Sequence, residues 1–210
     1  MQAFRFKATP RNNGVPEHQW CLRLMAKMEM AQHIAAHSLK VWQVASAIAP
    51  ETAAAGVAWD PRLVQAAALL HDITKTRSLT TGEDHAASGR ALLKGLGLEQ
   101  VGAIVGQHVS LKTYPPLTLD EAVLVNYADK RVIHDRVVSL AQREEYILAT
   151  YGTNSGHRCR IRQLWVETRK IEQRIFRGLP FGPGDMEEHL DIRGFESGMA
   201  QFHRLVRLDL

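Results

Sequence analysis

The stretch that decides the fold is AAALLHDITK, residues 66–75, an apolar run that ends in a histidine, an aspartate and a lysine. The consecutive apolar residues predict one buried helix. Burying the His71 imidazole and the Asp72 carboxylate at the end of such a helix is unfavourable unless a partner compensates them, and a cation suits both groups together. His71 and Asp72 therefore indicate a metal site, whose remaining ligands have to come from elsewhere in the chain.

The composition limits the class of protein. With 210 residues, 45% of them hydrophobic and 23% charged, the chain is long enough for one well-cored domain and a smaller appendage. The net charge of +4 suits an anionic substrate better than nucleic acid, which usually binds to a basic stripe interleaved with aromatics. Two cysteines are too few for a disulfide framework, and no signal peptide or transmembrane span is evident. We therefore expect a cytoplasmic protein without a membrane or nucleic-acid partner.

Helical periodicity runs along most of the chain, and no stretch has clear strand periodicity, so we predict an all-α fold. Asp60 and Pro61 form an N-cap followed by a first-turn proline, and Pro50 is expected to end the preceding helix. Residues 78–82 resemble a loop, and residues 118–121 match the spacing of a capping box. The expected helices begin near residue 16 and cover 31–49, 60–72, 83–93, 99–108, 118–149 with or without a break, 158–177 and a last segment after 184.

Histidines and aspartates on separate predicted helices offer a ligand set for iron, manganese, zinc or nickel. His37 lies on the apolar face of its helix, with His33 as a rival one turn earlier. On a continuous helix Asp72 and Lys75 would share a face, so that the Lys75 ammonium could hold a phosphate oxygen beside the metal. The candidate ligands are His37, His71, Asp72, His85, His108 and Asp129.

The order of these residues resembles the HD superfamily of metal-dependent phosphohydrolases. The resemblance rests on the pair His37-Ser38, on His71-Asp72, and on Asp129 within an Ala-Asp-Lys sequence. Residues 71–75 are similar to the His-Asp-Ile-Gly-Lys signature of HDIG-type members, with Thr74 in the place of glycine.

The resemblance covers about residues 17–151 and implies an HD-domain helical bundle with a C-terminal helical extension. We expect a flexible N-terminus at residues 1–15 and a metal-binding core at 16–151. Residues 157–210 would form the extension, packed on the core or lying in the interface of a homodimer.

In this superfamily two intervening histidines mark a two-metal subgroup. The resemblance implies two divalent ions, iron or manganese first, with nickel, cobalt or zinc as alternatives. It also implies attack by a metal-bound hydroxide on a phosphate ester or anhydride of a small metabolite, such as a nucleotide or dinucleotide. Asp72 and Lys75 are the implied catalytic residues. The first metal would be held by His37, His71, Asp72 and Asp129, and the second by His85, His108 and a bridging Asp72.

Weaker candidates surround this set. Lys112, Lys130 and Arg131 are substrate-binding candidates alongside Lys75, each with a solvent-facing alternative. Asn126, one turn before Asp129, is placed to orient that carboxylate, and His33 is a packing or pocket residue. Two other functions stay open, a mixed-valent di-iron oxygenase acting on a phosphonate or polyol, and a non-catalytic sensor.

The basic cluster in residues 158–177 is interpreted as the polar face of an amphipathic helix, with nucleic-acid contact as the minority interpretation. His134 and Asp135 are interpreted as solvent-facing residues of the helix that follows Asp129.

Overall fold

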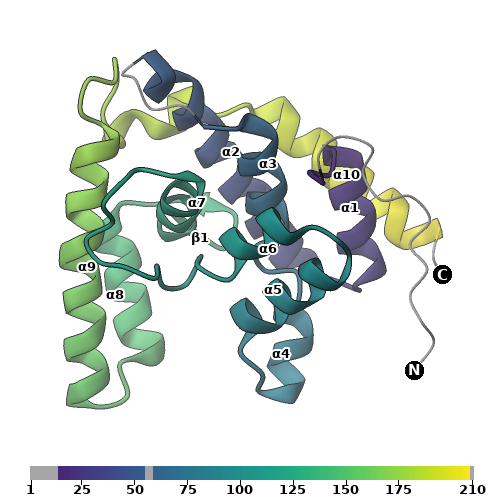
Figure 1. The fold of residues 1–210 in the computed structure, drawn as a ribbon, viewed down its shortest axis with the longest axis horizontal. Coiled ribbons are helices and arrows are strands. Elements are labelled where there is room, and N and C mark those ends of the chain that lie inside the picture. The colour runs from purple at the N-terminus through teal and green to yellow at the C-terminus, as the bar shows by residue number, and fades with distance from the viewer. Residues whose placement is uncertain (1–13, 55–58, 209–210) are drawn as a thin grey trace.

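The computed structural model describes residues 14–54 and 59–208 (Figure 1). Ten α-helices occupy these ranges, so the predicted all-α fold is confirmed. None of the described helices combines the length and the apolar composition that a membrane crossing requires. The α-helices are α1 His18–Lys27, α2 Gln32–Ala54, α3 Pro61–Leu70, α4 Lys75–Thr81, α5 His85–Gly95, α6 Glu99–Val105, α7 Glu121–Lys130, α8 Leu140–Tyr151, α9 Ser155–Ile175 and α10 Ile192–Leu208, and the smaller elements are β1 Val132–Ile133, β2 Arg136–Val137 and the 3-10 helix η1 Pro183–His189.

Helices α2 and α3 form the centre of the molecule. Helix α2 packs against α3, α7, α10 and the β1–β2 hairpin, and α3 packs against α1, α6 and α7. The α8–α9 pair runs along one side of this core, and α1 with α10 lies on the other side (Figure 1). The ends of α3, α5, α6 and α7 that carry the predicted ligands consequently lie within one bundle.

The start of α3 follows the predicted mechanism. Asp60 is the N-cap, and its side chain accepts hydrogen bonds from the backbone N–H groups of Arg62 and Leu63. The Asp60 N–H donates in turn to Glu121 Oε1 at 2.9 Å, which ties the start of α3 to the start of α7. An N-cap of this kind contributes about 1 kcal/mol, and α3 adds a run of fully buried side chains up to Leu70.

Helix α2 continues through Pro50 to Ala54, so the predicted stop at Pro50 is wrong. Proline removes one intrahelical donor but keeps a helical φ, and packing can outweigh that loss. The Thr52 hydroxyl donates to the carbonyls of Ile48 and Ala49, and the Trp59 indole donates to the same hydroxyl. These contacts hold the last turn of α2 onto the segment that leads into α3.

Two other boundaries differ from the prediction. Residues 78–82 were expected to form a loop, but they belong to or end helix α4, which stops where Gly82 adopts φ 71°. The predicted capping box at residues 118–121 is also wrong, because Asp120 is the N-cap of α7 and accepts from Val123 N–H. Polar residues suit a short helix and a loop equally well, so periodicity could not separate the two.

A β-hairpin interrupts the helix that was expected to run past Asp129. Strand β1 pairs antiparallel with β2, Val132 opposite Val137. His134 has φ 56° and forms the turn with Asp135, so the prediction that these two residues lie on a helix is wrong. The turn carries the His134 carbonyl back toward α2.

The C-terminal helices pack on the rest of the chain. Helix α9 contacts α7 and α8, and α10 contacts α1 and α2. Gly198 lets α10 approach Leu39 closely, because a Cβ at that position would lie 2.7 Å from Leu39 Cδ2. The division into core and extension, and the alternative of a dimer interface, stay predictions. The expected flexible N-terminus lies outside the described residues, except for Gly14 and Val15.

Candidate metal centre

The six predicted ligands converge from five parts of the fold. His37 comes from α2, and His71 with Asp72 from the turn that follows α3. His85 is the first residue of α5, His108 lies just beyond α6, and Asp129 lies in α7. Two groups of three have ligand atoms within 4.8 Å of one another, and they are His37–His71–Asp72 and Asp72–His85–His108.

The two oxygens of Asp72 face different groups. Oδ2 lies 3.5 Å from His71 Nε2. Oδ1 lies 3.2 Å from His85 Nε2 and 3.4 Å from His108 Nε2. This division is what a carboxylate that bridges two cations would require.

Asp129 approaches the cluster from the side of the first group. Its Oδ1 lies 3.0 Å from His37 Nε2 and 3.9 Å from His71 Nε2. The position agrees with its predicted role beside His37 and His71, and that role stays a prediction.

Three of the histidines are oriented by backbone carbonyls. A carbonyl can only accept a hydrogen bond, so the Nδ1 atom that contacts it carries the proton. In the neutral ring the Nε2 atom then has its lone pair directed into the cluster, as a metal ligand requires. The pairs are His37 Nδ1 to His134 O at 2.9 Å, His71 Nδ1 to Ala68 O at 2.8 Å, and His108 Nδ1 to Val105 O at 2.7 Å.

Several buried polar atoms in the cluster need a cation or a proton. His71 Nε2 and Asp72 Oδ1 are buried and have no hydrogen-bond partner in the part of the chain that the structure describes. His85 Nε2 and His108 Nε2 approach to 3.1 Å, which two lone pairs would not tolerate. The nitrogen and oxygen donor set, together with these atoms, is compatible with divalent metal binding.

The electrostatics of the carboxylates agree with this view. Burial raises the pKa of Asp72, but the charge of His71 and the neighbouring imidazoles of His108 and His85 outweigh it, and the pKa lies well below the usual range. Burial also raises the pKa of Asp129, and the neighbouring imidazole of His37 and the charge of Arg143 reverse the shift, so its pKa is far below normal. Both groups are therefore carboxylates, ready to neutralise cations.

The pKa values of the His71 and His108 imidazoles shift in opposite directions. Burial lowers the pKa of His71, but the negative charges of Asp72 and Asp129 raise it by a larger amount, and the resulting pKa is about 8. Burial lowers the pKa of His108, and this effect exceeds the contribution of Asp72. His71 thus holds a proton that a cation would have to displace, because a ligating imidazole is neutral.

Thr74, which replaces the glycine of the HDIG signature, contacts the second group. Its hydroxyl donates to the His85 carbonyl at 2.8 Å and accepts from the Ser88 hydroxyl at 2.9 Å. Thr74 is buried, so these bonds fix the first turn of α5 against the turn that carries Asp72.

Lys75 lies close to the cluster in the chain but not as predicted. Helix α3 ends at Leu70 and Lys75 begins α4, so Asp72 and Lys75 do not share the face of one helix. The Lys75 N–H donates to the Asp72 carbonyl at 2.8 Å across the turn. Lys75 is half-buried, and its roles in catalysis and in substrate binding stay predictions.

Three weaker candidates are placed elsewhere or act on other partners. Lys112 is exposed, because α6 ends at Val105 and the chain turns away, and His33 is exposed rather than part of a pocket. Within the described residues, the Asn126 side chain makes no hydrogen bond to Asp129. Its amide donates to the carbonyls of Gln107 at 2.9 Å and His108 at 2.8 Å, so it positions the other histidine loop.

Lys130 and Arg131 are both buried, which corrects the solvent-facing alternative for each. Lys130 Nζ donates to Asn126 Oδ1 at 2.8 Å, and burial lowers its pKa to about 8. The Arg131 guanidinium donates to Tyr127, Glu172 and the backbone carbonyls of Val138 and Pro183. Arg131 therefore joins α7 to the C-terminal helices, and its role as a substrate-binding residue stays a prediction.

Arg143 is the residue that sequence reasoning missed. It extends from α8 and places Nη2 3.6 Å from Asp129 Oδ1, with 13% of its side chain exposed. No motif includes it. Its spacing of three residues from the apolar Leu140 was the available signal, because residues three apart share a helix face.

Comparison with known proteins assigns the chain to a family. A family model described as HD domain matches residues 34–141, which is about half of the chain and includes all six predicted ligands. The chain belongs to the HD-domain family. The predicted resemblance is thereby confirmed. No solved structure matches the chain at a significant level.

Two curated relatives of this HD-domain chain carry the same name, tRNA (cytidine(56)-2'-O)-methyltransferase. The relative from Picrophilus torridus is 30% identical in an alignment of 158 positions, which covers 66% of this chain and 44% of the relative. The relative from Thermoplasma volcanium is 32% identical in an alignment of 143 positions, which covers 61% of this chain and 40% of the relative. The chain thus spans less than half the length of the curated relatives it matches.

These names correct the predicted function. They describe methylation of a tRNA, whereas the sequence predicted hydrolysis of a phosphate ester or anhydride of a small metabolite. They also give no support to the two alternatives, a di-iron oxygenase and a non-catalytic sensor. Metal ligands of the HD type specify a centre but not its substrate, which explains how the motif could be recognised while the function was predicted wrongly.

Proposed function

We propose that this HD-domain chain acts on tRNA, and that its metal centre serves a hydrolytic reaction there. The observation that carries the proposal is the division of Asp72, whose two oxygens face two different groups of histidines. A carboxylate placed in this way supports two divalent cations in one site.

The residues proposed to hold the cations are those of the two groups with Asp129. His37, His71 and Asp129 would serve the first cation, and His85 and His108 the second, with Asp72 shared. Divalent cations supply Lewis-acid activation of water when bound in such a site. The backbone carbonyls behind His37, His71 and His108 orient each ring through Nδ1, so that each Nε2 would be free to hold a cation.

The proposed substrate comes from the relatives. Both are named for a reaction on tRNA, and this chain corresponds to less than half of each. The methyl transfer gives each whole relative its name, and this chain matches less than half of that relative. A metal-centred reaction in the matched part is compatible with methyl transfer elsewhere in the same tRNA-processing protein. This proposal departs from our expectation that nucleic acid is not a partner, which rested on composition alone.

A second candidate is methyl transfer to tRNA by this chain itself. The relatives' names favour it directly, at 30% and 32% identity. In that case the His and Asp cluster would support the structure of the protein or the binding of RNA rather than the chemistry.

The test uses an unmodified tRNA transcript and the protein loaded with manganese or iron. Products are followed by gel electrophoresis and mass spectrometry, with and without the methyl donor S-adenosylmethionine. We expect a metal-dependent change in the tRNA without the methyl donor, and loss of that change in Asp72→Asn. A mass increase of one methyl group that requires the donor and persists in Asp72→Asn would instead establish the second candidate.

Some predictions from the sequence are carried forward unchanged. Iron or manganese as the bound metal, a cytoplasmic location and a homodimer all stay predictions. Metal analysis of the purified protein tests the first of these.

A further inference from the structure

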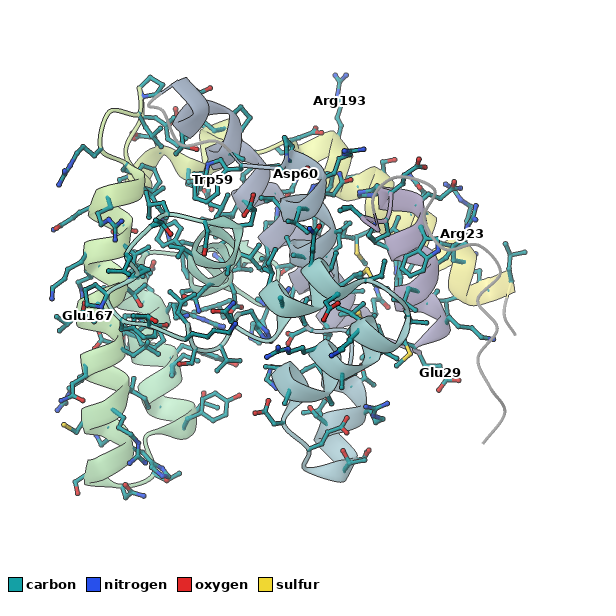
Figure 2. The ribbon with its side chains drawn as sticks, in the orientation of Figure 1. Arg23, Glu29, Trp59, Asp60, Glu167 and Arg193 are labelled. Atoms are coloured by element: carbon teal, nitrogen blue, oxygen red, sulfur yellow. The ribbon has the colours of Figure 1, made fainter. Side chains whose placement is uncertain are left out.

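Arg143 lies beside the metal centre but is not saturated by protein partners. Its Nη2 atom is 3.6 Å from Asp129 Oδ1, longer than a good hydrogen bond. Its Nε atom is buried and has no hydrogen-bond partner among residues 14–54 and 59–208. Arg23 and Arg193, by contrast, are exposed on α1 and α10 and point away from the core (Figure 2).

The surroundings of Arg143 hold its guanidinium in place. The group lies 5.6 Å from the centroid of the Tyr146 ring, and that ring packs edge-on against His134 at 5.8 Å. His134 is the residue whose carbonyl orients His37. The Arg143 guanidinium therefore lies against Tyr146, whose ring contacts His134, the same residue that orients the predicted ligand His37.

The comparison with Arg131 shows that Arg143 keeps spare donors. Arg131 uses its Nε and both Nη atoms in hydrogen bonds to protein groups. Arg143 makes one long ion pair to Asp129, and its buried Nε has no hydrogen-bond partner among the described residues. A buried donor without a partner is unfavourable, so a ligand that accepts from it gains binding free energy.

The charge of the centre selects an anion. Two divalent cations would bring four positive charges, and the carboxylates of Asp72 and Asp129 offset half of them. The four imidazoles are neutral when they ligate. Arg143 adds a further positive charge beside Asp129, so the loaded site favours a ligand with negative oxygens.

We propose that Arg143 is a binding residue for a phosphate-type anion, and that it holds the oxygens of the substrate against the metal centre. Its forked guanidinium suits two oxygens of one phosphate. The proposal rests on the proposed function for the source of that anion, a phosphodiester of RNA. Arg143 lies two residues beyond the part of the chain that matches the HD family model, so the family match does not account for it.

The test measures the binding of inorganic phosphate and of a short RNA trinucleotide to the manganese-loaded protein by calorimetry. The variants are Arg143→Gln and Arg143→Lys, and Arg193→Gln is the control for the loss of one exposed positive charge. Manganese content is measured for every variant. We expect Arg143→Gln to retain its manganese and to bind phosphate about tenfold to hundredfold more weakly. Arg143→Lys should lie between, and Arg193→Gln should match the unmodified protein.

The two ligands separate the two sources of the anion. Dependence on Arg143 for both ligands supports an RNA phosphodiester, and dependence for inorganic phosphate alone supports a site for free phosphate. Unchanged phosphate affinity in manganese-loaded Arg143→Gln overturns the proposal. Loss of manganese with unchanged phosphate affinity of the loaded fraction also overturns it, because Arg143 would then serve Asp129.

If Arg143→Gln does not fold, Arg143→Lys decides the question. It keeps the charge but removes the fork, so an affinity equal to that of the unmodified protein contradicts the proposal. The result is independent of the tRNA assay, since Arg143-dependent phosphate binding can be found in a protein that leaves tRNA unchanged. That combination would overturn the proposed function and leave the anion site in place.

Discussion

The two groups of ligands that share Asp72 are held in different ways. In the first group, His37 and His71 are both anchored through Nδ1 to backbone carbonyls, and the His71 side chain is fully buried. In the second group, His108 has the same kind of anchor, but His85 is 17% exposed and begins a helix. His85 is held through its backbone carbonyl, by Thr74. In the first group each imidazole ring is therefore oriented by its own backbone contact. In the second group the position of His85 depends on the first turn of α5.

Loss of Asp72 should break both groups together. In Asp72→Asn the shared carboxylate loses its charge, so we expect metal content to fall from about two ions per chain to less than one. Metal is measured by mass spectrometry of the purified protein, with Asp135→Asn on the exposed hairpin turn as control. A variant that keeps one full equivalent would show that Asp72 does not bridge.

Loss of His85 should affect only the second group. We expect His85→Ala to keep about one ion per chain, because His37, His71 and Asp129 are untouched. The same measurement on His33→Ala, which alters an exposed histidine of α2, should give the full content. Equal loss of both ions in His85→Ala would mean that the two groups do not bind independently.

A smaller effect on metal binding is expected when Thr74, which supports His85, is changed. Thr74→Val keeps the shape of the side chain but removes the hydroxyl that holds the His85 carbonyl and Ser88. We expect the second metal to bind about tenfold more weakly, as is usual when a group that orients a ligand is lost. Titration with manganese would measure this, with Thr80→Val on the exposed side of α4 as control. Equal weakening at both metals would assign Thr74 to general stability.

The smallest effect is expected from pH. Burial lowers the pKa of His71, but Asp72 and Asp129 raise it to about 8, so the ring is largely protonated at neutral pH in the absence of metal. A cation must displace that proton, and its affinity should therefore decrease as the pH falls. Between pH 8.5 and pH 7.5 we expect a decrease of about threefold at the first group, measured by manganese titration. A flat profile would show that His71 is not a ligand.

The candidate ligands could be singled out from the sequence because each lies at a helix end or on an apolar helix face, and because their order resembles that of the HD superfamily. An apolar run ending in His71-Asp72 is unfavourable without a cation, and Asp60 with Pro61 marks the start of that helix independently. The supporting contacts could not be predicted in this way. His37, His71 and His108 are oriented by backbone carbonyls, and a carbonyl carries no sequence signal.

The roles of charged and polar residues beside the site were the least predictable. Asn126 lies one turn before Asp129 and Arg131 lies two residues after it, but Asn126 bonds to the His108 loop and Arg131 to the C-terminal helices. The turn after Asp72 and the hairpin after Lys130 redirect the chain and so change which helix faces pack together. Neither segment has a periodic hydrophobic pattern that would reveal it in the sequence. Arg143 reaches the site only because the hairpin returns α8 toward Asp129.

The central claim is that the two groups hold two divalent cations, and metal analysis of protein purified anaerobically tests it most directly. We expect about two equivalents per chain, with iron or manganese as the main metal. A content of one equivalent or less, unchanged after incubation of the protein with excess manganese and removal of unbound metal, would contradict it.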